Sequence, residues 1–409
     1  MKRRVVITGG SVVSALGNEW PEILKALKAG KNCVRYMKEW ERYTYMNSML
    51  AAPIDFTMPE YPRKKTRGLG RVGQLSLVSA DRALAHAGID SGDPLLKSGR
   101  FGISYGSSMG SIDPLMDFYS MLVLDDIKKI TATTYIKAMP QTCAANIGVF
   151  FGLTGRLITT NTACTSSSQA IGFAFEAIQQ GIQDIMLAGG AEELSPMDVA
   201  VFDTLFAASS KNDTPDKTPA AYDKHRDGLV VGEGAGTLVL EEYEHALKRG
   251  AHIIAEIAGF ATNMDGMHIT QPNRGTQSIV MKMALENAQL DSASIGYVNT
   301  HGTATDTGDV AESWATADVF QRPVPASTLK SYVGHTLGAC GVIEAWISVN
   351  MMREKWFCPN LNLRELDPAV GPLDYITGGG REIDTEYIMS NNFAFGGINT
   401  SLIFRKVSE

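Results

Sequence analysis

The sequence predicts an α/β fold made of two similar halves. In each half a short strand runs into a loop of small residues and then into a helix that is apolar nearly all round, over residues 157–181 and again over 327–352. Such helices are buried, and strands that alternate with buried helices are typical of a layered α/β core. No low-complexity linker separates the halves, so we expect residues 1–250 and 251–409 to be two units fused through one core.

The composition is that of a globular protein with a large core. Of 409 residues, 44% are apolar and 20% are charged, which is ordinary for folded domains. The net charge of −7 argues against binding of the whole molecule to nucleic acid or to an anionic membrane. No apolar stretch reaches the length of a membrane span, and Thr8–Ser11 interrupts the apolar N-terminal run too early for a signal peptide.

The five cysteines indicate a reducing compartment. Their number is odd, their spacing is wide and no two form a CxxC pair. Neither a disulfide framework nor a structural zinc site is therefore expected. Reduced thiols are typical of the cytosol, so we predict a cytoplasmic protein without a bound metal.

The first half begins with a buried strand. Arg4–Thr8 is a β-branched run closed by Gly9-Gly10, and Pro21–Gly30 has the proline start and glycine end of a helix. Residues 31–68 contain several prolines and are expected to be irregular. The other elements expected here are a helix at Gln74–Gly88, strands at Phe101–Tyr105, Leu157–Asn161, Asp184–Gly190 and Leu229–Glu241, and a buried helix from Cys164 to about Gly181.

The second half repeats this layout. We expect strands at Ile253–Phe260, Ile295–Thr300 and Ser401–Phe404, a short strand that ends at Ser327–Lys330, and helices at Thr276–Ala288 and Gly338–Met352. The run Gly232–Gly236 resembles a phosphate loop only in its glycine content, because it lacks the strand–turn–helix context and the Lys-Ser/Thr pair. Close packing between strands explains these glycines better.

Cys164 is the strongest candidate for a chemical role. It lies where a strand ends and a helix begins, among small hydroxyl residues. The positive end of a helix stabilises a thiolate, and small neighbours leave the sulfur accessible. The alternative is a buried structural cysteine, since free cysteine packs as a small hydrophobe. The strand-to-helix position favours a nucleophile.

Two histidines lie in similar loops of the second half. His301 directly follows a strand, and His335 follows Gly334 in another small-residue loop. Loops at strand ends carry function disproportionately often. A single histidine is usually structural, but two of them together with Cys164 form a set typical of a catalytic site.

These residue types suit carbon–carbon bond formation on thioesters. A thiolate is both a good nucleophile and a good leaving group for acyl transfer. Decarboxylation of a malonyl group produces an enolate, and two neutral imidazole N–H groups can stabilise its oxygen. Backbone N–H groups near Cys164 and Phe395 can hold the oxyanion of the tetrahedral intermediate.

Lys330 and Glu344 are candidates for supporting roles. Glu344 lies in a helix that is otherwise apolar, where a carboxylate is costly unless it is paired. Lys330 is the plausible partner. The alternative is a glutamate on the helix surface.

Ordered motifs recur along almost the full length of the chain. They are Asn161–Ser166, Ala188–Glu193, Asp223–Gly228, Asn299–Thr303, Lys330–Thr336 and Ser390–Gly397. Together they resemble the elongating β-ketoacyl-acyl-carrier-protein synthases. The resemblance implies a thiolase-like five-layer αβαβα sandwich of two βαβαβαββ halves. It also implies decarboxylative Claisen condensation with malonyl-acyl-carrier protein, and no cofactor beyond the phosphopantetheine that carries the substrates.

The resemblance also implies roles for individual residues. Cys164 is the acylated nucleophile, His301 and His335 serve decarboxylation and oxyanion binding, and Lys330 and Glu344 support them. The remaining residues that the family pattern assigns are Phe395 at a gate beside the nucleophile, Phe393 and Met109 in the acyl pocket, and Thr303 and Thr305 as pantetheine contacts.

Two departures from the family pattern indicate a subgroup. Ala394 replaces the glycine expected between the two phenylalanines of the gate loop, and Tyr36–Tyr45 is unusually aromatic and basic. These features are similar to the subgroup found with aryl polyene pigment and polyketide pathways rather than primary fatty acid synthesis.

Three other members of this superfamily are alternatives. A degradative thiolase acting on CoA esters is expected to have a second cysteine near the C-terminus, whereas the last one here is Cys358. A priming synthase uses a Cys-His-Asn set, but His335 occupies the relevant position here. A chain-length factor lacks the nucleophile. This chain could still be the catalytic partner of such a factor in a heterodimer.

The partners implied are acyl carrier protein and a second subunit. Carrier proteins are acidic, and Lys64, Lys65, Arg67 and Lys211 are the basic residues expected to dock one. The alternative is that these side chains are only solvated. The family resemblance implies a homodimer in which each subunit completes the acyl pocket of the other.

Overall fold

The computed structural model describes residues 2–407, and within them eleven strands form one mixed sheet. The order across it is β13-β11-β10-β15-β16-β9-β1-β8-β6-β4-β5. The first half supplies β1 (Val5–Val13), β4 (Phe101–Gly106), β5 (Leu157–Thr160), β6 (Ile185–Glu192) and β8 (Gly234–Glu242). The second half supplies β9 (Ala255–Met264), β10 (Ile295–Asn299), β11 (Pro325–Ser327), β13 (Asp374–Tyr375), β15 (Tyr387–Ala394) and β16 (Ile398–Lys406).

The two halves have the same strand order and the same strand directions. When the short edge strand β13 is left out of the count, each half has five strands, and in each half the first strand lies next to the fifth, followed by the fourth, second and third. The second strand is parallel to its two neighbours, whereas the fifth is antiparallel to both the fourth and the first. The predicted duplication of an α/β unit is therefore confirmed.

A short seam joins the halves. The start of β1 pairs antiparallel with the start of β9, through Val5 with Ile257 and Ile7 with Ala255. The other edge of β1 pairs with β8 along most of its length. The first strand of the chain therefore lies in the middle of the sheet.

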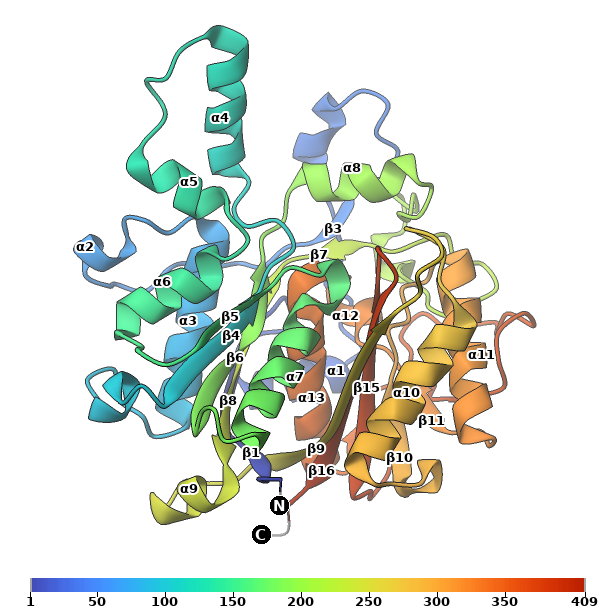
Figure 1. Ribbon diagram of the computed structural model, residues 1–409. Coiled ribbons are helices and arrows are strands. Elements are labelled where there is room, and N and C mark those ends of the chain that lie inside the picture. The colour runs from blue at the N-terminus through green and yellow to red at the C-terminus, as the bar shows by residue number, and fades with distance from the viewer. Residues whose placement is uncertain (1, 408–409) are drawn as a thin grey trace.

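Helices form three further layers (Figure 1). The buried helices α7 (Ser166–Gln179) and α13 (Cys340–Arg353) contact one another and lie between the sheets of the two halves. On the outside, α3 (Arg71–His86) and α6 (Thr142–Phe151) cover the first half, while α10 (Arg274–Ala288) packs on β9 and β16 and against α11 (Asp306–Phe320). The two halves of the sheet lie on either side of α7 and α13 and count as two layers, so the helices and the sheet together make the five layers that the family resemblance implies.

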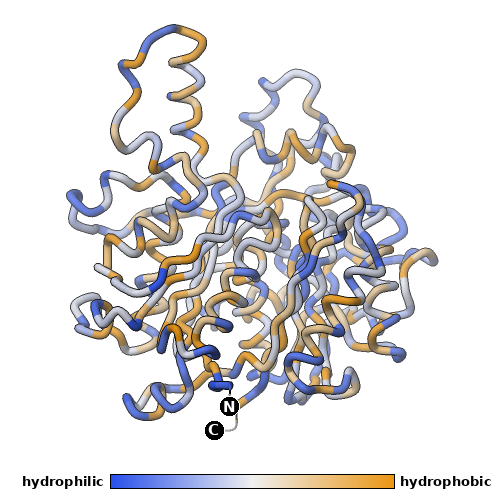
Figure 2. The backbone as a smooth tube through the Cα atoms, viewed as in Figure 1, coloured by the Kyte–Doolittle hydropathy of each residue, from blue (hydrophilic) through white to orange (hydrophobic). Residues whose placement is uncertain are grey.

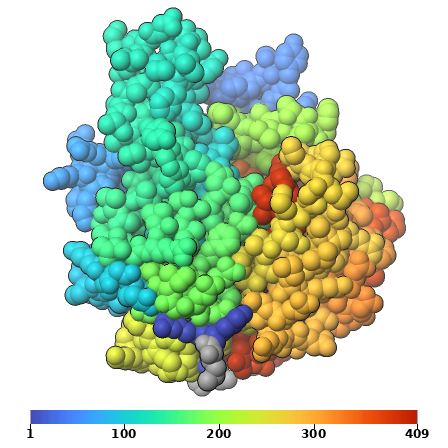
Figure 3. Space-filling view, in the orientation of Figure 1, coloured from blue at the N-terminus to red at the C-terminus, as the bar shows by residue number. Residues whose placement is uncertain are grey.

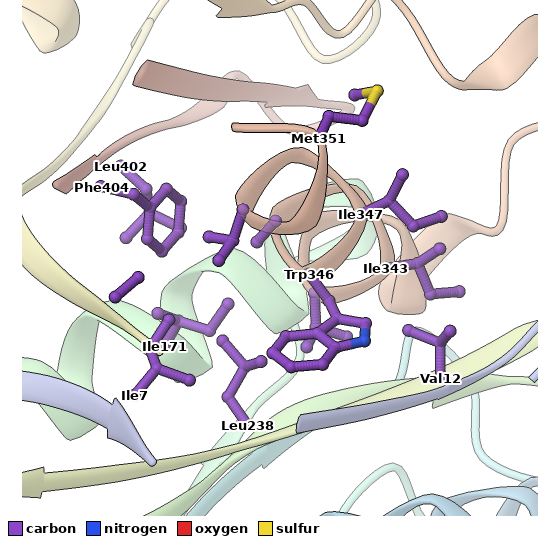
Figure 4. Close-up of a cluster of buried hydrophobic side chains, with 14 of the residues drawn as sticks. Ile7, Val12, Ile171, Leu238, Ile343, Trp346, Ile347, Met351, Leu402 and Phe404 are labelled. Carbon is purple, nitrogen blue, oxygen red and sulfur yellow. The ribbon is translucent and has the colours of Figure 1, made fainter. Parts of the chain in front are cut away.

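The central layer contains the densest apolar packing. Figure 4 shows Ile343, Trp346 and Ile347 of α13 among residues of α7, β1, β8 and β16. The ring of Trp346 lies against Gly10, where an added Cβ would approach it to 2.5 Å. This contact explains the glycine at position 10. Strand β1 continues past the end that the sequence predicted, to Val13, because its pairing with β8 extends that far.

Several elements were not predicted from the sequence. Residues 31–68 are not wholly irregular: they contain β2 (Arg35–Tyr36), η1 (Lys38–Arg42), β3 (Leu50–Ala52) and α2 (Arg63–Thr66). The other elements that the sequence did not predict are α6, α11, β13 and β15 described above, and η2 (Pro94–Lys97), α4 (Asp113–Leu124), α5 (Ala132–Ala138), η3 (Ala163–Thr165), α8 (Pro196–Thr204), η4 (Pro215–Lys217), α9 (Tyr243–Lys248), η5 (Ser292–Ser294), α12 (Lys330–Val333), η6 (Leu337–Ala339), β12 (Trp356–Phe357) and β14 (Arg381–Glu382). The predicted strand Leu229–Glu241 is divided into β7 (Val231–Gly232) and β8.

The helices α4 and α5 project from the body of the molecule. Figures 2 and 3 show this excursion at the upper left, with hydrophobic residues along its outer part. Its exposed apolar side chains include Tyr119, Leu122, Leu124 and Ile127. Among residues 2–407 no helix combines the length and apolar character that crossing a bilayer requires.

Candidate active site

Cys164, His301 and His335 meet where the two halves face each other. Cys164 lies in η3 after β5, His301 follows β10, and His335 follows α12. The Sγ of Cys164 lies 2.9 Å from Nε2 of His335. The two imidazole rings are 5.1 Å apart and nearly perpendicular. All three side chains are buried, and one ligand atom from each lies within 4.8 Å of the others.

A sharp elbow places Cys164 at the start of α7. Ala163 has a φ of 49°, in the left-handed region that non-glycine residues rarely adopt. This turn connects the end of β5 to η3 and α7. The predicted strand-to-helix position of Cys164 is therefore present, although a single 3-10 turn separates the cysteine from the helix.

Hydrogen bonds to the histidines determine which nitrogen carries the proton. The Leu337 backbone N–H donates to Nδ1 of His335, at 3.3 Å. Nδ2 of Asn392 lies 3.4 Å from Nδ1 of His301, and the same Nδ2 donates to Glu344. Since Nδ1 accepts in both rings, the neutral histidines carry hydrogen on Nε2. Each histidine thus has one N–H available for an oxyanion.

Burial keeps both histidines neutral. It lowers the pKa of His301 well below the usual 6.5, and the charges of Lys330 and His335 act in the same direction. Burial and the charge of Lys330 also lower the pKa of His335. A neutral imidazole with its hydrogen on Nε2 donates one hydrogen bond from Nε2 and accepts one at Nδ1, which matches the contacts of both rings.

Burial has the opposite effect on the nucleophile. It raises the pKa of the Cys164 thiol to about 11, although the Lys330 charge and the backbone N–H groups of Phe395 and Cys164 act to lower it. Both N–H groups belong to residues that line the cavity beside the sulfur. Because they favour negative charge there, they also form a suitable pair of donors for an oxyanion on a Cys164 thioester.

Lys330 and Glu344 form a buried ion pair behind the histidines. Lys330 Nζ lies 2.5 Å from Glu344 Oε1, and both side chains are almost fully buried. Burial acts to lower the pKa of Lys330, but the Glu344 carboxylate outweighs it and the net shift is upward. The other oxygen of Glu344 accepts from Asn392, at 2.8 Å. Glu344 is therefore not on the helix surface, and the charge of Lys330 is held beside the site.

A cavity of about 240 Å³ leads to the three residues. Its lining includes Phe393 and Phe395 of the predicted gate and acyl pocket, and Thr303 and Thr305 of the predicted pantetheine contacts. Figure 3 shows red C-terminal residues between the green and the yellow surface in the upper part of the molecule. The cavity is therefore shaped by segments that lie far apart in the sequence.

Two carboxylates that the sequence did not single out position the His301 loop. Glu312 of α11 accepts the backbone N–H groups of His301, at 2.6 Å, and Gly302, at 2.8 Å. Asp309, one turn earlier, accepts the N–H of Ala304 at 3.0 Å. Burial raises the pKa of Glu312 to about 7. Their spacing on the helix after the His301 loop is the sequence signal that could have identified them.

Other predicted site residues are not among those that line the cavity. Met109, in the loop after β4, is not among the residues that line it. Lys64 and Lys65 lie on α2, which packs near α6, and Arg67 follows that helix. Lys211 donates to the backbone carbonyl of His225 and pairs with Asp227. The structure of one chain does not gather the basic residues into one patch at the cavity.

The nucleophile and histidines could also hold a metal ion. A thiolate and two imidazoles within 4.8 Å are a possible zinc ligand set. However, the charge of Lys330 disfavours a proton on either histidine and would oppose a metal cation in the same way. The arrangement therefore fits a site for developing negative charge better than a cation site.

Comparisons with known proteins agree with this geometry. The chain matches the β-ketoacyl synthase N-terminal domain over residues 2–246 and the C-terminal domain over residues 254–364. It is 36% identical over 417 residues to 3-oxoacyl-acyl-carrier-protein synthase 2 of Vibrio harveyi, with 100% of both chains covered.

Solved structures extend the comparison. A β-ketoacyl synthase from Burkholderia phymatum is 56% identical, with a TM-score of 0.98 and 100% of both chains covered. The ishigamide ketosynthase/chain length factor is 27% identical, with a TM-score of 0.89 and 100% of both chains covered. With the matched domains, these similarities show that the chain belongs to the β-ketoacyl synthase family of acyltransferases.

Proposed function

We propose that the chain elongates acyl groups by decarboxylative Claisen condensation, with Cys164 as the acyl acceptor. The sulfur of Cys164 gives up its proton and attacks the thioester carbonyl of an acyl-acyl-carrier protein. The bond between the acyl group and the carrier sulfur breaks, the acyl-enzyme forms, and the leaving carrier sulfur takes up the proton. Malonyl-carrier protein then loses carbon dioxide, and its enolate carbon attacks the acyl group on Cys164. The products are β-ketoacyl-carrier protein and the free Cys164 thiolate. The observation that carries this proposal is the 2.9 Å contact of Cys164 with a neutral His335 at the end of the cavity.

The histidines act mainly on the enolate. Nε2–H of His301 and of His335 would donate to the thioester oxygen of malonyl as it gains negative charge. The backbone N–H groups of Cys164 and Phe395 would hold the oxyanion formed when the acyl-cysteine is attacked. Lys330 supports both steps because its charge keeps the histidines neutral and favours the thiolate. Thr303 and Thr305 line the cavity and are proposed to contact the pantetheine arm.

The direct test uses purified protein and two carrier substrates. Mass spectrometry should show an acyl adduct on Cys164 after mixing with acyl-carrier protein, and a β-ketoacyl product after malonyl-carrier protein is added. A thiolase would instead form product from two CoA esters without releasing carbon dioxide. Condensation should survive dialysis against a chelator, because we propose that no metal or cofactor takes part. Product from CoA esters alone would contradict the proposal.

We propose a homodimer formed along the edge strand β5. This strand ends the sheet, so its outer edge is unpaired within the chain. Leu157 on β5 is 49% exposed and Val149 on α6 is 79% exposed, and an unpaired strand edge beside exposed apolar side chains can pair with a second chain. Light scattering should give twice the chain mass, and Leu157→Asp with Val149→Asp should give the monomer. A monomeric wild type that pairs only with a chain-length factor would favour the heterodimer.

The five cysteines are free and buried, which suits the proposed cytosolic location. Our assignment to an aryl polyene or polyketide pathway rests on Ala394 and on the aromatic segment at residues 36–45. A product profile with unsaturated primers would support this pathway, whereas exclusive use of saturated primers would favour primary fatty acid synthesis.

A further inference from the structure

The aromatic segment near residue 40 has an inner face that is mostly thioether. Its tyrosines point outward: Tyr45 is 99% exposed and Tyr36 is 41% exposed. Trp40 is buried, and three partly buried methionines pack on the same side. We call the side chains of Met37, Trp40, Met46 and Met49 the methionine pad.

Hydrogen bonds connect the segment that carries the methionine pad to α8, and strand pairing connects it to the loop of His335. Asp203 of α8 accepts the backbone N–H groups of Asn47 and Ser48, both at 2.9 Å. The pad segment continues into β3, which pairs with β7. The β7 residue Val231 forms a bridge with His335. The pad therefore has a defined position relative to the catalytic histidine.

The methionine pad also backs the wall of the cavity. It belongs to one apolar cluster with Phe202 and Phe395. These two rings are 5.3 Å apart, and both line the cavity that leads to Cys164. A movement of Phe395 away from the cavity would therefore press on this cluster.

Thioether side chains make such a movement cheap. Methionine is unbranched and flexible, so it can fill a changed space without a large packing penalty. The backbone beside Phe395 can turn as well, because Gly396 and Gly397 already have φ values of 88° and 69°. A deformable layer thus lies behind a movable ring.

We propose that the methionine pad determines which acyl chains reach Cys164, by setting how far the Phe395 ring can move. Long acyl chains need the ring displaced further than short ones do. A looser pad should therefore favour long chains, and a stiffer pad should favour short ones. The inference rests on the proposed function, because it assumes that Cys164 is acylated from the cavity.

The test compares acylation rates of Cys164 with butyryl- and palmitoyl-carrier protein by mass spectrometry. Met46→Ala and Met49→Ala should each raise the palmitoyl-to-butyryl rate ratio by roughly tenfold, the scale on which small volume changes in an apolar pocket act. Met49→Leu keeps the volume but adds a branch, and should lower the ratio. It also serves as a second variant if the alanine variants fold poorly.

The control is Met352→Ala, at a fully buried position of α13 outside the cluster. It should lower the melting temperature without changing the ratio. An unchanged ratio in the folded pad variants, with normal acylation of the wild type, would overturn the inference. Failure of both substrates to acylate the wild type would instead count against the proposed function.

Discussion

The two central helices begin in the same way, yet only one of them carries the nucleophile. A 3-10 turn precedes each: η3 before α7 and η6 before α13. Each turn starts with a residue of left-handed backbone, Ala163 at a φ of 49° and Leu337 at 45°. The next residue is Cys164 in the first half and Gly338 in the second. The duplicated fold thus contains two equivalent elbows.

The two elbows differ in the group that lies beside the backbone N–H of their second residue. In the second elbow the Gly338 N–H donates to the carboxylate of Glu192, at 2.9 Å. A Cβ on Gly338 would lie 2.6 Å from that carboxylate. In the first elbow the N–H of Cys164 acts on its own sulfur. The same geometry therefore binds a permanent carboxylate in one half and is left for a transient oxyanion in the other.

This difference shows how duplication separates catalytic roles. Strand β10 ends at the loop of His301, whereas its counterpart β4 ends at Ser107 and Ser108, which Glu192 holds through its carboxylate. The first half thus supplies the nucleophile and its own backbone N–H, and the second half supplies the two histidines and the backbone N–H of Phe395. Catalysis requires both because neither half contains the complete set.

The largest expected effect on activity comes from removing the thiol of Cys164 in the first elbow. Cys164→Ala should abolish both the acyl-enzyme and condensation, because no other thiol lies at an elbow. Cys164→Gln should still decarboxylate malonyl-carrier protein, since the histidines remain. Cerulenin-type epoxides should label Cys164 alone, as read by peptide mass mapping. Labelling of Cys340, whose Sγ lies 3.1 Å from the Cys164 carbonyl oxygen, would contradict the assignment.

Removing the donors of the second half should have the next largest effect. His301→Ala and His335→Ala should each slow condensation by roughly 10²–10³, the usual cost of one oxyanion donor. Acylation of Cys164 should survive at least in part, because it does not need the enolate. Rates of acylation and of condensation are measured separately. A folded variant that loses acylation completely would contradict this division of roles.

Lys330 links the two elbows electrostatically, and its removal should shift the pH profile. Both histidines have pKa values well below 6.5, so the wild type should keep its condensation rate as the pH falls to 6. Lys330→Met removes a charge that lowers these pKa values, so they should rise and the acidic loss should begin at a higher pH. Acylation should also slow, because a smaller fraction of Cys164 is thiolate at a given pH once its pKa rises. Lys330→Arg, which keeps the charge, is the control.

The same pKa shifts predict how stability depends on pH. The unfolded chain binds protons at its histidines near pH 6.5, whereas the folded protein resists protonation of His301 and His335. The contribution of these two histidines to the free energy of unfolding should therefore fall as the pH drops below 6.5, whereas Glu312 and Asp198, whose pKa values burial raises to about 7, act in the opposite direction. Chemical denaturation of the wild type and of His335→Ala between pH 7.5 and pH 5.5 isolates the contribution of His335, because the carboxyl groups are the same in both proteins.

A side chain at Gly338, in the second elbow, should lower the stability of the protein rather than its catalytic rate. Gly338→Ala places a methyl group against the Glu192 carboxylate and should lower the free energy of unfolding by about 1–3 kcal/mol. Gly148→Ala, where an added Cβ meets nothing within 4 Å, is the matched control. Thermal unfolding measures both. An unchanged free energy of unfolding in Gly338→Ala would show that the contact between residue 338 and the Glu192 carboxylate has room for a methyl group.

The smallest effect is expected on the surface, away from both elbows. Lys64→Glu with Arg67→Glu should raise the KM for carrier-bound substrate and weaken its salt dependence, because acidic carrier proteins are steered by basic residues. The kcat with a small pantetheine thioester should not change. Lys65 and Lys211 are left intact because both also bind backbone carbonyl groups. An unchanged KM would mean that these side chains are only solvated.

Much of the fold could be predicted because local patterns specify it. The run Leu157–Asn161 followed by Cys164 predicts a strand-to-helix turn, and β5, η3 and α7 form this turn in the structure. The apolar helix around Glu344 predicted a paired carboxylate, and Lys330 is its partner. In both cases the signal lies within a few residues of the feature.

The parts that could not be predicted depend on distant contacts. Glu192 holds Gly338, and Asp203 holds Asn47, across more than a hundred residues of sequence in each case. Their partners are backbone N–H groups, which every residue but proline has, so composition gives no signal for them. The short strands of residues 31–68 depend on the pairing of β3 with β7, which lies far along the sequence. Motif resemblance located Phe395, but not the pad behind it.

The seam between β1 and β9 has a consequence for folding. Strand β1 comes early in the chain, but its two neighbours are formed by residues 234–264. Contacts between such distant segments form slowly, and the unpaired edge of an apolar strand is prone to aggregation meanwhile. If the chain were divided at residue 250, the first half would expose the edge of β1 and the second half the edge of β9. Each half would also expose the face of its central helix, α7 or α13, that contacts the other half. The whole chain is therefore the smallest unit that we expect to refold, and expressing either half alone should give insoluble protein.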